Sequence, residues 1–342
     1  MLQQVIVSPR NIIFREVRLP DITANQVLVK IYRIGICGSD VHVYHGSHPF
    51  INYPLTQGHE VSGVISKVGE NVHDLSEGMK VTIEPQVFCG KCHPCRNGKY
   101  NLCEELKVMG FQTTGAASEF FTVDSAKITQ LPDGMGFDEG AMLEPLAVSV
   151  HAIKQAGDVA GMSIAVLGAG PIGTLVAQSA KGLGAKSVLI TDVSDFRLQK
   201  AKECGIDFTV NTLRANFGDA VAAAFGPDKA DVIFDCAGVN ASIGQAIRHA
   251  RKGSSIILVA VFEGIAQVDL AVLNDHELCL NTSMMYRHED YLTAIDLVTK
   301  GKVRLSTLIS AHFPFREYNS AYEYIDKNRD KALKILIDVC AD

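Results

Sequence analysis

The stretch SIAVLGAGPIG, residues 163–173, decides the fold of this chain. Residues 163–167 form a short apolar run typical of a buried strand, and the apolar spacing over residues 172–183 predicts a helix. The intervening glycines permit a tight turn, close approach of the backbone to a pyrophosphate, and close packing of helix on strand. We therefore predict a dinucleotide site formed by Gly168, Gly170, Pro171, Ile172 and Gly173.

Asp192 follows the next strand-like run, residues 187–191. It stands at about the ~20-residue distance at which an acid binds the adenosine ribose, and its charge would repel a 2′-phosphate, so NAD is favoured over NADP. Arg197 is a further cofactor-binding candidate, since an arginine here can bind a 2′-phosphate, pair with Asp192 or stack on adenine. The alternative is a structural glycine turn without nucleotide, which the strand, helix and acid together disfavour.

The alternation of strand and helix patterns continues beyond this motif. A strand is expected over residues 230–236, a helix over 242–250 and a strand over 254–261, which predicts a doubly wound parallel sheet. Residues 254–264 would supply a buried strand and a turn that lines the nicotinamide pocket or a subunit contact. The fold class is therefore α/β.

The 342 residues are enough for two domains. Residues 1–150 contain short β-like runs, such as 27–31 and 61–68, and form a β-rich domain with long loops; residues 151–285 form the nucleotide-binding domain. We expect residues 286–342 to complete the first domain, because helices at about 291–300 and 320–328 and a strand at 333–339 are too few to fold alone.

Composition excludes several classes of partner. The formal net charge is −6 and no block of lysine and arginine occurs, so a nucleic-acid surface is not expected. No basic start precedes an apolar run, and no run approaches the ~20 residues that span a bilayer. We expect a cytoplasmic protein without a membrane or nucleic-acid partner.

Four of the nine cysteines lie close together, at Cys89, Cys92, Cys95 and Cys103. Their spacing allows four thiolates to surround one tetrahedral zinc ion, which leaves no open position and indicates a structural site. Disulfides or free thiols are the alternative, but disulfide frameworks belong to short secreted chains. The remaining Cys204, Cys236, Cys279 and Cys340 are interpreted as core residues.

A second metal site is expected at Cys37 and His59, each of which adjoins a glycine in a polar segment. A metal ion whose protein ligands leave one position open can act as a Lewis acid on a substrate. Glu60 follows His59 directly, and neighbouring side chains of an extended strand point to opposite faces, so both bind one ion only where the backbone is irregular. Glu60 could therefore bind the metal directly, bind it intermittently, or contact its ligands from outside. Glu144 is the other candidate for the remaining position on the metal, either directly or through a bound water. Each acid alone could equally be an ordinary surface or buried group.

At these residues the chain resembles the zinc-dependent medium-chain dehydrogenase/reductase family, the alcohol dehydrogenases. The motifs are GICGSDVH at 35–42, GHE at 58–60, the cysteine lobe, GAGPIG, and EPLAVSVHA at 144–152. The resemblance implies a GroES-like catalytic domain, a Rossmann domain, two zinc ions per subunit and NAD. Its catalytic-zinc positions match Cys37, His59, Glu60 and Glu144, its proton relay matches Ser39 and His42, and Asp40 resembles the acid that orients His59.

Within that family the chain is similar to the polyol branch. Glu144 in its EPL motif and the pair Tyr286 and Arg287 carry the likeness, and the arginine would contact sugar hydroxyls. Residues 48–54 resemble dehydrogenases of L-gulonate and L-galactonate, whose carboxylate would give Arg287 a bidentate partner; an interdomain salt bridge is the alternative. Val43 replaces a tyrosine of sorbitol dehydrogenases, which argues against sorbitol itself. The family also implies a homo-oligomer, a tetramer or a dimer.

The hypothesis is the oxidation of a secondary alcohol of a polyol or sugar acid, with zinc lowering the pKa of the alcohol and NAD taking the hydride. Ser39 would accept the proton and pass it through the nicotinamide ribose to His42. L-threonine 3-dehydrogenase and 2,3-butanediol dehydrogenase share both zinc patterns and remain alternatives. A non-catalytic nucleotide-sensing protein is a third, although it would not need Cys37, His59, Ser39 and His42 together.

Overall fold

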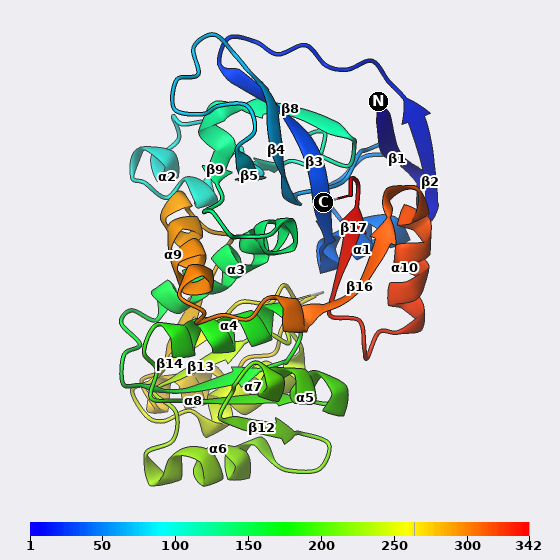
Figure 1. The fold of residues 1–342 in the computed structure, drawn as a ribbon. Helices are drawn as coiled ribbons and strands as arrows, with labels where there is room; N and C mark the ends of the chain where they lie inside the picture. The colour runs from blue at the N-terminus through cyan, green and yellow to red at the C-terminus, as the bar shows by residue number, and fades with distance from the viewer. Residues whose placement is uncertain (263, 342) are drawn as a thin grey trace. The chain divides into compact units, whose positions relative to one another are not determined.

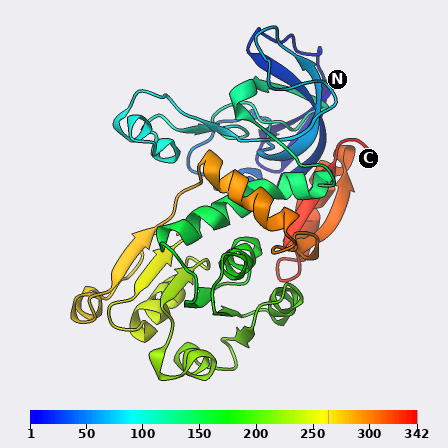
Figure 2. The same ribbon diagram turned by 60° about the vertical axis from the view of Figure 1, so that its left-hand side comes forward.

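The computed structural model describes residues 1–262 and 264–341. The chain forms two compact units, which Figures 1 and 2 show in two views. The first comprises Met1–Glu144 together with the chain from Ile309 onward, and the second is Pro145–Leu308. Helix α3 (Phe137–Gln155) runs through the junction at Glu144.

The first unit is built on a seven-stranded sheet in the order β16-β17-β3-β4-β5-β9, with β8 also paired to β3. Strand β3 is the longest, because residues 26–36 are mostly β-branched, aliphatic or aromatic and contain no turn residue before Gly35. The strands of this sheet are β3 (Gln26–Ile36), β4 (Glu60–Val68), β5 (Lys80–Ile83), β8 (Phe120–Asp124), β9 (Ile128–Gln130), β16 (Ile309–Pro314) and β17 (Lys334–Asp338).

Smaller elements surround this sheet. Two antiparallel pairs are separate from it, β1 with β2 and β6 with β7. Their bounds are β1 (Leu2–Ser8), β2 (Asn11–Glu16), β6 (Gln86–Val87) and β7 (Lys107–Val108), and the helices of this unit are α1 (Gly38–His45), α2 (His93–Arg96) and α10 (Tyr318–Lys327). Tyr44 of α1 stacks on Tyr322 of α10 with ring centroids 4.3 Å apart, so the two helices share one aromatic core.

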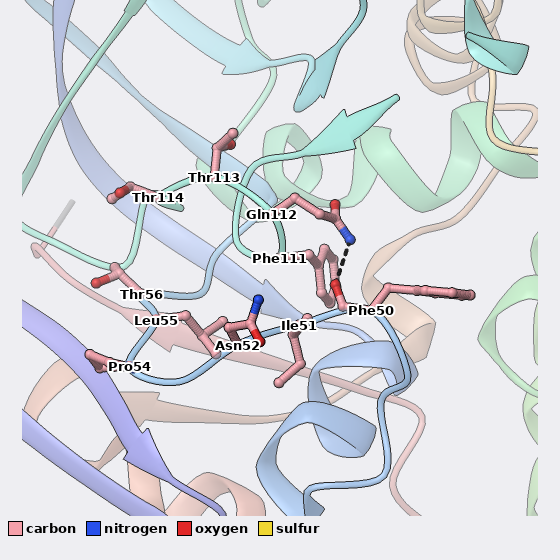
Figure 3. Close-up of a pocket in the computed structure, with 10 residues that line it drawn as sticks. All are labelled: Phe50, Ile51, Asn52, Pro54, Leu55, Thr56, Phe111, Gln112, Thr113 and Thr114. Carbon is pink, nitrogen blue, oxygen red and sulfur yellow. Dashed lines mark hydrogen bonds between the residues drawn. The ribbon is translucent and has the colours of Figure 1, made fainter. Parts of the chain in front are cut away.

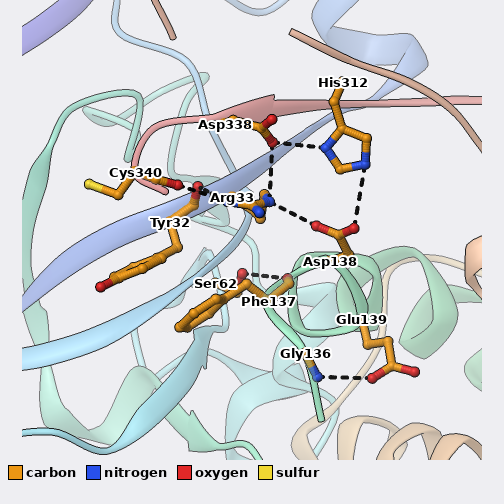
Figure 4. A network of polar contacts seen from close by, with 10 residues as sticks. All are labelled: Tyr32, Arg33, Ser62, Gly136, Phe137, Asp138, Glu139, His312, Asp338 and Cys340. Carbon is orange, nitrogen blue, oxygen red and sulfur yellow. Dashed lines mark hydrogen bonds and ion pairs between the residues drawn. The ribbon is translucent and has the colours of Figure 1, made fainter. Parts of the chain in front are cut away.

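The C-terminal segment completes the first unit. Strand β17 pairs antiparallel with β3, so Ile335 lies opposite Ile36, and both side chains are buried. A polar network on the same strands is shown in Figure 4. The Arg33 guanidinium lies 2.8 Å from Asp138 and 3.1 Å from Asp338, and His312 contacts both carboxylates. These ion pairs join β3, β16 and β17 to the start of α3.

The second unit confirms the predicted doubly wound parallel sheet. Six parallel strands lie in the order β12-β11-β10-β13-β14-β15. They are β10 (Ser163–Leu167), β11 (Ser187–Asp192), β12 (Phe208–Asn211), β13 (Val232–Asp235), β14 (Ser255–Leu258) and β15 (Cys279–Thr282), and the helices are α4 (Pro171–Gly182), α5 (Asp195–Glu203), α6 (Phe217–Phe225), α7 (Asn240–His249), α8 (Leu270–Asp275) and α9 (His288–Thr299).

Helices cover both faces of this sheet because its strands are apolar on both sides. On β10, Ile164 and Val166 pack into one cluster with residues of α4 and α5, whereas Ala165 and Leu167 pack into another with residues of α6 and α7. The period-two alternation of a strand thus divides a continuous apolar run between two cores.

The chain returns to the first unit at Ile309, later than the residue 286 expected from the sequence. Helix α9 stays with the second unit, because the Asp290 carboxylate lies 2.8 Å from His151 Nδ1 and 2.7 Å from Lys154 Nζ of α3. Leu297 packs so closely on Gly182 of α4 that a Cβ there would lie 2.7 Å from it.

Three further expectations have an outcome in the structure. Cys279 is exposed on the edge strand β15, so its interpretation as a core residue is wrong, while Cys204 is buried as expected. The expected turn at 262–264 includes residue 263, which lies outside the described residues. Within the described chain, none of the helices has the length and apolar character needed to cross a bilayer.

Candidate active site

Cys37 lies at the point where β3 ends and α1 begins. Asp40, three residues into the turn, accepts a hydrogen bond from the Cys37 backbone N–H at 2.9 Å. An acid in the first turn of a helix satisfies a free N–H and is favoured by the helix dipole. The start of the helix therefore fixes the backbone at Cys37.

His59 and Glu60 lie at the start of β4, which begins at Glu60. Gly58 has φ = +96°, and a Cβ at this position would lie 2.8 Å from the Ala117 nitrogen. The backbone is thus irregular just before the strand, and the two neighbouring side chains need not point to opposite faces. Ligand atoms of Cys37, His59 and Glu60 all lie within 4.8 Å of one another.

Asp40 also faces His59. One carboxylate oxygen lies 3.5 Å from His59 Nδ1 and accepts a hydrogen bond from Gln57 Nε2 at 3.3 Å. Tyr322 in turn donates to Gln57 Oε1 at 2.6 Å. Burial would lower the pKa of His59, but the Asp40 carboxylate raises that pKa well above its usual value. An acid behind an imidazole orients the ring and increases its basicity, as metal sites require.

A buried lysine holds Glu60. Lys334 Nζ lies 2.7 Å from Oε1 and 2.6 Å from Oε2 of Glu60, and both side chains are almost fully buried. Gly35, opposite Glu60 in the β3–β4 pairing, has no room for a side chain: its Cβ would lie 2.1 Å from Oε2. Burial would lower the pKa of Lys334, but the Glu60 carboxylate and Cys37 raise it above its usual value.

Glu144 is buried on α3, with 6% of its surface exposed. It does not belong to the group of closely spaced ligand atoms found among the described residues. Its charge nevertheless helps to raise the pKa of Lys334, after the larger effects of burial and of Glu60 and Cys37. Direct binding of a metal by Glu144 therefore stays a prediction.

The two relay candidates lie three residues apart on α1. Ser39 is half-buried in its first turn, and His42 is exposed, with Nδ1 3.3 Å from Ser47 Oγ. Residues at this spacing share one face of a helix. Val43, next to His42, is fully buried.

A cavity of about 520 Å³ lies in the first unit between the loops 50–56 and 111–114 (Figure 3). Gln112 Nε2 donates to the Phe50 carbonyl at 3.0 Å and joins the loops. The Phe111 ring lies 5.0 Å from the His59 ring, which connects this cavity to the metal candidates. The lining side chains are all uncharged: Phe50, Ile51, Asn52, Pro54, Leu55, Thr56, Phe111, Gln112, Thr113 and Thr114.

The four-cysteine cluster forms as predicted, with the sulfur atoms of Cys89, Cys92, Cys95 and Cys103 all within 4.8 Å of one another. Backbone N–H groups already point at the sulfurs: Cys89 N and Glu105 N each lie 3.3 Å from Cys103 Sγ. A backbone hydrogen bond from Glu104 lowers the pKa of Cys92 to about 7. Such donors favour thiolates, so the cluster suits Zn²⁺.

The glycine turn has the geometry that a pyrophosphate needs. Gly168 has φ = +96°, a Cβ on Gly173 would lie 1.8 Å from the Gly168 carbonyl oxygen, and a Cβ on Gly170 would meet nothing within 4 Å. The space at Gly170 leaves its backbone accessible at the N-terminus of α4, while Gly168 and Gly173 make the turn tight. The residues present therefore fit a dinucleotide.

Asp192 closes this turn from the end of β11. Its Oδ2 accepts a hydrogen bond from Ala169 N at 2.7 Å, and its Oδ1 accepts one from Ser194 N at 2.9 Å. Arg197 Nη1 lies 3.9 Å from Oδ2. The arginine is thus held against the acid, which is one of the alternatives that the sequence left open.

The two substrate candidates of the second unit differ in exposure. Tyr286 is fully buried and makes an edge contact with Tyr291 at 5.2 Å, so its ring belongs to the core. Arg287 is half-buried, and its Nη2 lies 2.8 Å from Glu289 Oε1. Its backbone N–H donates to Asp290 at 2.8 Å, which fixes the start of α9.

Sequence reasoning missed Lys334, Gln57 and Phe111. Lys334 was the one that the sequence could have indicated. It lies inside the apolar run 333–339, and a lysine in a buried strand needs an anionic partner. The other two act through contacts between segments far apart in the chain, Gln57 with Tyr322 and Phe111 with His59.

Comparisons with known proteins agree with this geometry. Residues 23–133 match the alcohol dehydrogenase GroES-like domain, and residues 171–300 match the zinc-binding dehydrogenase family. A 2-dehydro-3-deoxy-L-galactonate 5-dehydrogenase of Pseudoalteromonas atlantica is 34% identical over 93% of both chains, and sorbitol dehydrogenase 1 of Saccharomyces cerevisiae is 32% identical over 91% of this chain and 90% of its own. An alcohol dehydrogenase (rspB) from Escherichia coli, solved with NADH, has 30% identity and a TM-score of 0.92 over 99% of both chains.

The fold and the paired metal sites define a zinc-dependent dehydrogenase. The chain belongs to the zinc-containing medium-chain alcohol dehydrogenase family, in its polyol and sugar-acid branch. Its GroES-like and Rossmann folds are confirmed, and its cofactors are zinc, at a structural and a catalytic site, and NAD.

Proposed function

We propose that this dehydrogenase oxidises a secondary alcohol of a polyol or sugar acid with NAD. One observation carries the proposal. A thiol, an imidazole and a carboxylate have ligand atoms within 4.8 Å of one another, and Phe111 joins this cluster to a cavity lined by uncharged side chains, both apolar and polar. Cys37 and His59 would hold the zinc, with Glu60 and Glu144 as further candidates.

Zinc bound here supplies Lewis-acid chemistry that makes an alcohol easier to deprotonate, and NAD supplies the hydride acceptor. The chain must then remove one proton. We propose that Ser39 takes it and that His42, exposed on the same face of α1, passes it to solvent. A Ser39→Ala variant should then lose turnover, and with it the pH dependence that His42 imparts; an unaltered pH profile would argue against this route.

The cavity favours a hydroxyl-rich substrate. Asn52, Thr56 and Thr114 offer amide and hydroxyl groups, which bind sugar hydroxyls without charge. A sugar acid needs a cation as well, and Arg287 is our candidate for it. Threonine would carry an ammonium group, and the cavity lining includes no acid to receive it, which disfavours the threonine dehydrogenase alternative.

The test is NADH formation with polyols, aldonates, threonine and 2,3-butanediol, with NADP as the cofactor control. Rapid oxidation of a polyol or an aldonate with NAD supports the proposal. Arg287→Met should raise KM for aldonates and leave KM for neutral polyols unchanged. Turnover confined to threonine or butanediol would overturn the substrate assignment.

We also propose that the protein is a homo-oligomer. Strand β15 ends the parallel sheet, and Cys279, Asn281 and Thr282 on it are exposed, as are the nearby Leu270 and Met284. An unpaired strand edge with apolar neighbours is a surface that a second copy can extend. Light scattering after size exclusion would decide: a mass above 37.0 kDa supports the proposal, and a monomer would refute it.

A further inference from the structure

A series of buried hydrogen bonds leads from helix α10 to the metal candidates of the first unit. Tyr322 of α10 donates to Gln57 Oε1 at 2.6 Å, and Gln57 Nε2 donates to the Asp40 carbonyl at 3.1 Å and to Asp40 Oδ1 at 3.3 Å. Asp40 Oδ1 in turn lies 3.5 Å from His59 Nδ1. None of these four residues exposes more than 4% of its surface, so the contacts are shielded from water.

The neighbours of the Gln57 amide fix its orientation. An amide has a nitrogen that donates and an oxygen that accepts, whereas a carbonyl and a carboxylate only accept. The two Asp40 oxygens therefore require the amide nitrogen, and the amide oxygen faces Tyr322. Burial raises the pKa of Tyr322 well above its usual value, so its hydroxyl keeps the proton that it donates to this oxygen.

The backbone of Gln57 is also held in place. Its carbonyl accepts a hydrogen bond from Ala117 N at 2.8 Å. The loop packs so closely there that a Cβ at Gly115 would lie 2.2 Å from the same carbonyl oxygen. The Gln57 side chain therefore starts from a fixed stretch of backbone, and Tyr322 and Asp40 fix its far end.

We propose that Gln57, held by Tyr322, is a positioning residue for the catalytic metal. The Asp40 carboxylate has two fixed donors, Cys37 N on Oδ2 at 2.9 Å and Gln57 Nε2 on Oδ1. They hold the carboxylate toward His59, whose Nδ1 faces it, so Nε2 is the ring nitrogen left for the metal. Tyr322 acts at one remove, because it stabilises the amide orientation that Asp40 needs. This inference rests on the metal centre of the proposed function and not on its substrate.

The competing view is that Gln57 and Tyr322 only stabilise the fold. Removal of one partner of a buried hydrogen bond destabilises a protein whether or not a metal is nearby. A structural role leaves the metal affinity of the folded protein unchanged, whereas a positioning role predicts a loss of affinity. The deciding readout is therefore the dissociation constant of the catalytic metal, measured well below the melting temperature and apart from turnover.

The experiment uses the full-length protein with zinc in its four-cysteine cluster and measures Co²⁺ binding at the catalytic site by visible absorption. The signal of Cys37→Ser is subtracted as the blank. Gln57→Met keeps the length of the side chain but loses the amide, and it should raise the dissociation constant about tenfold. Tyr322→Phe removes only the hydroxyl and should raise that constant about threefold. The second variant keeps the inference testable if Gln57→Met folds poorly.

Tyr44→Phe is the matched control. Tyr44 stacks on Tyr322 in the same aromatic core, but its hydroxyl donates to Asn319 at 3.0 Å and lies outside the series of hydrogen bonds. The dissociation constant of cobalt in Tyr44→Phe should stay within about twofold of wild type. Equal losses of affinity in Tyr44→Phe and Tyr322→Phe would show a general effect of the aromatic core and would overturn the inference.

Combined variants test whether the residues act in series. Gln57→Met with Tyr322→Phe should bind cobalt as Gln57→Met alone does, because the hydroxyl has already lost its partner. A loss equal to the product of the single effects, about thirtyfold, would show independent actions and contradict the proposal. In the same way, Gln57→Met should have no further effect on cobalt binding in Asp40→Ala, and a full tenfold effect there would contradict a role through Asp40.

The failure of this inference is distinguishable from the failure of the proposed function. Unchanged cobalt binding in folded Gln57→Met and Tyr322→Phe would overturn the positioning role and leave the metal centre intact. Equal cobalt binding in wild type and Cys37→Ser would instead remove the metal centre itself, and the inference with it.

Discussion

Replacing Gly35 by alanine should destabilise the first unit through the Glu60–Lys334 pair. The new Cβ would lie 2.1 Å from Glu60 Oε2 and 3.0 Å from Glu60 Cβ, so the carboxylate must shift, and we expect it to lose its contacts with Lys334. Breaking a buried ion pair leaves uncompensated charge and costs about 3–5 kcal/mol. At about 2–4 °C per kcal/mol for a unit of this size, the melting temperature should fall by roughly 6–20 °C.

Gly38→Ala is the matched control, because a Cβ at Gly38 meets nothing within 4 Å and the residue lies in the first turn of α1. We expect its melting temperature to stay within about 3 °C of wild type. The chain has no tryptophan, so unfolding is best followed by far-ultraviolet circular dichroism, with and without a zinc chelator. Equal melting temperatures for Gly35→Ala and wild type would refute the steric reasoning.

Three other variants test separate parts of the structure. Asp192→Ala removes the acceptor of the Ala169 N–H and should raise KM for NAD about tenfold, with a smaller effect on NADP; equal effects on both cofactors would contradict the ribose assignment. Cys95→Ser should release about one zinc per chain and increase proteolysis of the cysteine lobe; retention of both zinc ions would contradict the four-ligand site. Burial would raise the pKa of Asp290, but hydrogen bonds from His151 and Lys154 lower that pKa overall. The ionised carboxylate therefore stabilises the folded protein above about pH 4, and this stabilisation is lost as the pH falls further. Wild type and Asp290→Asn should therefore converge in stability as pH falls below about 4; a difference that persists in acid would contradict this sign.

Much of the second unit was predictable because its signals are local. The strand 163–167, the glycine turn and the helix that follows lie next to one another in sequence, and the helix began within one residue of its expected start. Period-two and 3.6-residue patterns report directly on such elements. The cysteine lobe was predictable for the same reason, since its four ligands lie within one short segment.

The remaining features depend on contacts that no local pattern encodes. Lys334 meets Glu60 only because β17 and β4 both pair with β3. The assignment of α9 to the second unit depends on the buried Asp290 and its partners on α3. Similar helical patterns would fit either unit, so the sequence could not place the boundary at Ile309.

The most direct test of the account is the zinc content of wild type and Cys37→Ser, measured with NAD-dependent oxidation of a polyol or aldonate on the same samples. The account predicts two zinc ions per chain in wild type and one in Cys37→Ser, which should lose turnover while it keeps its circular dichroism spectrum. Two zinc ions and full turnover in Cys37→Ser would contradict the assignment of this cluster as the catalytic centre.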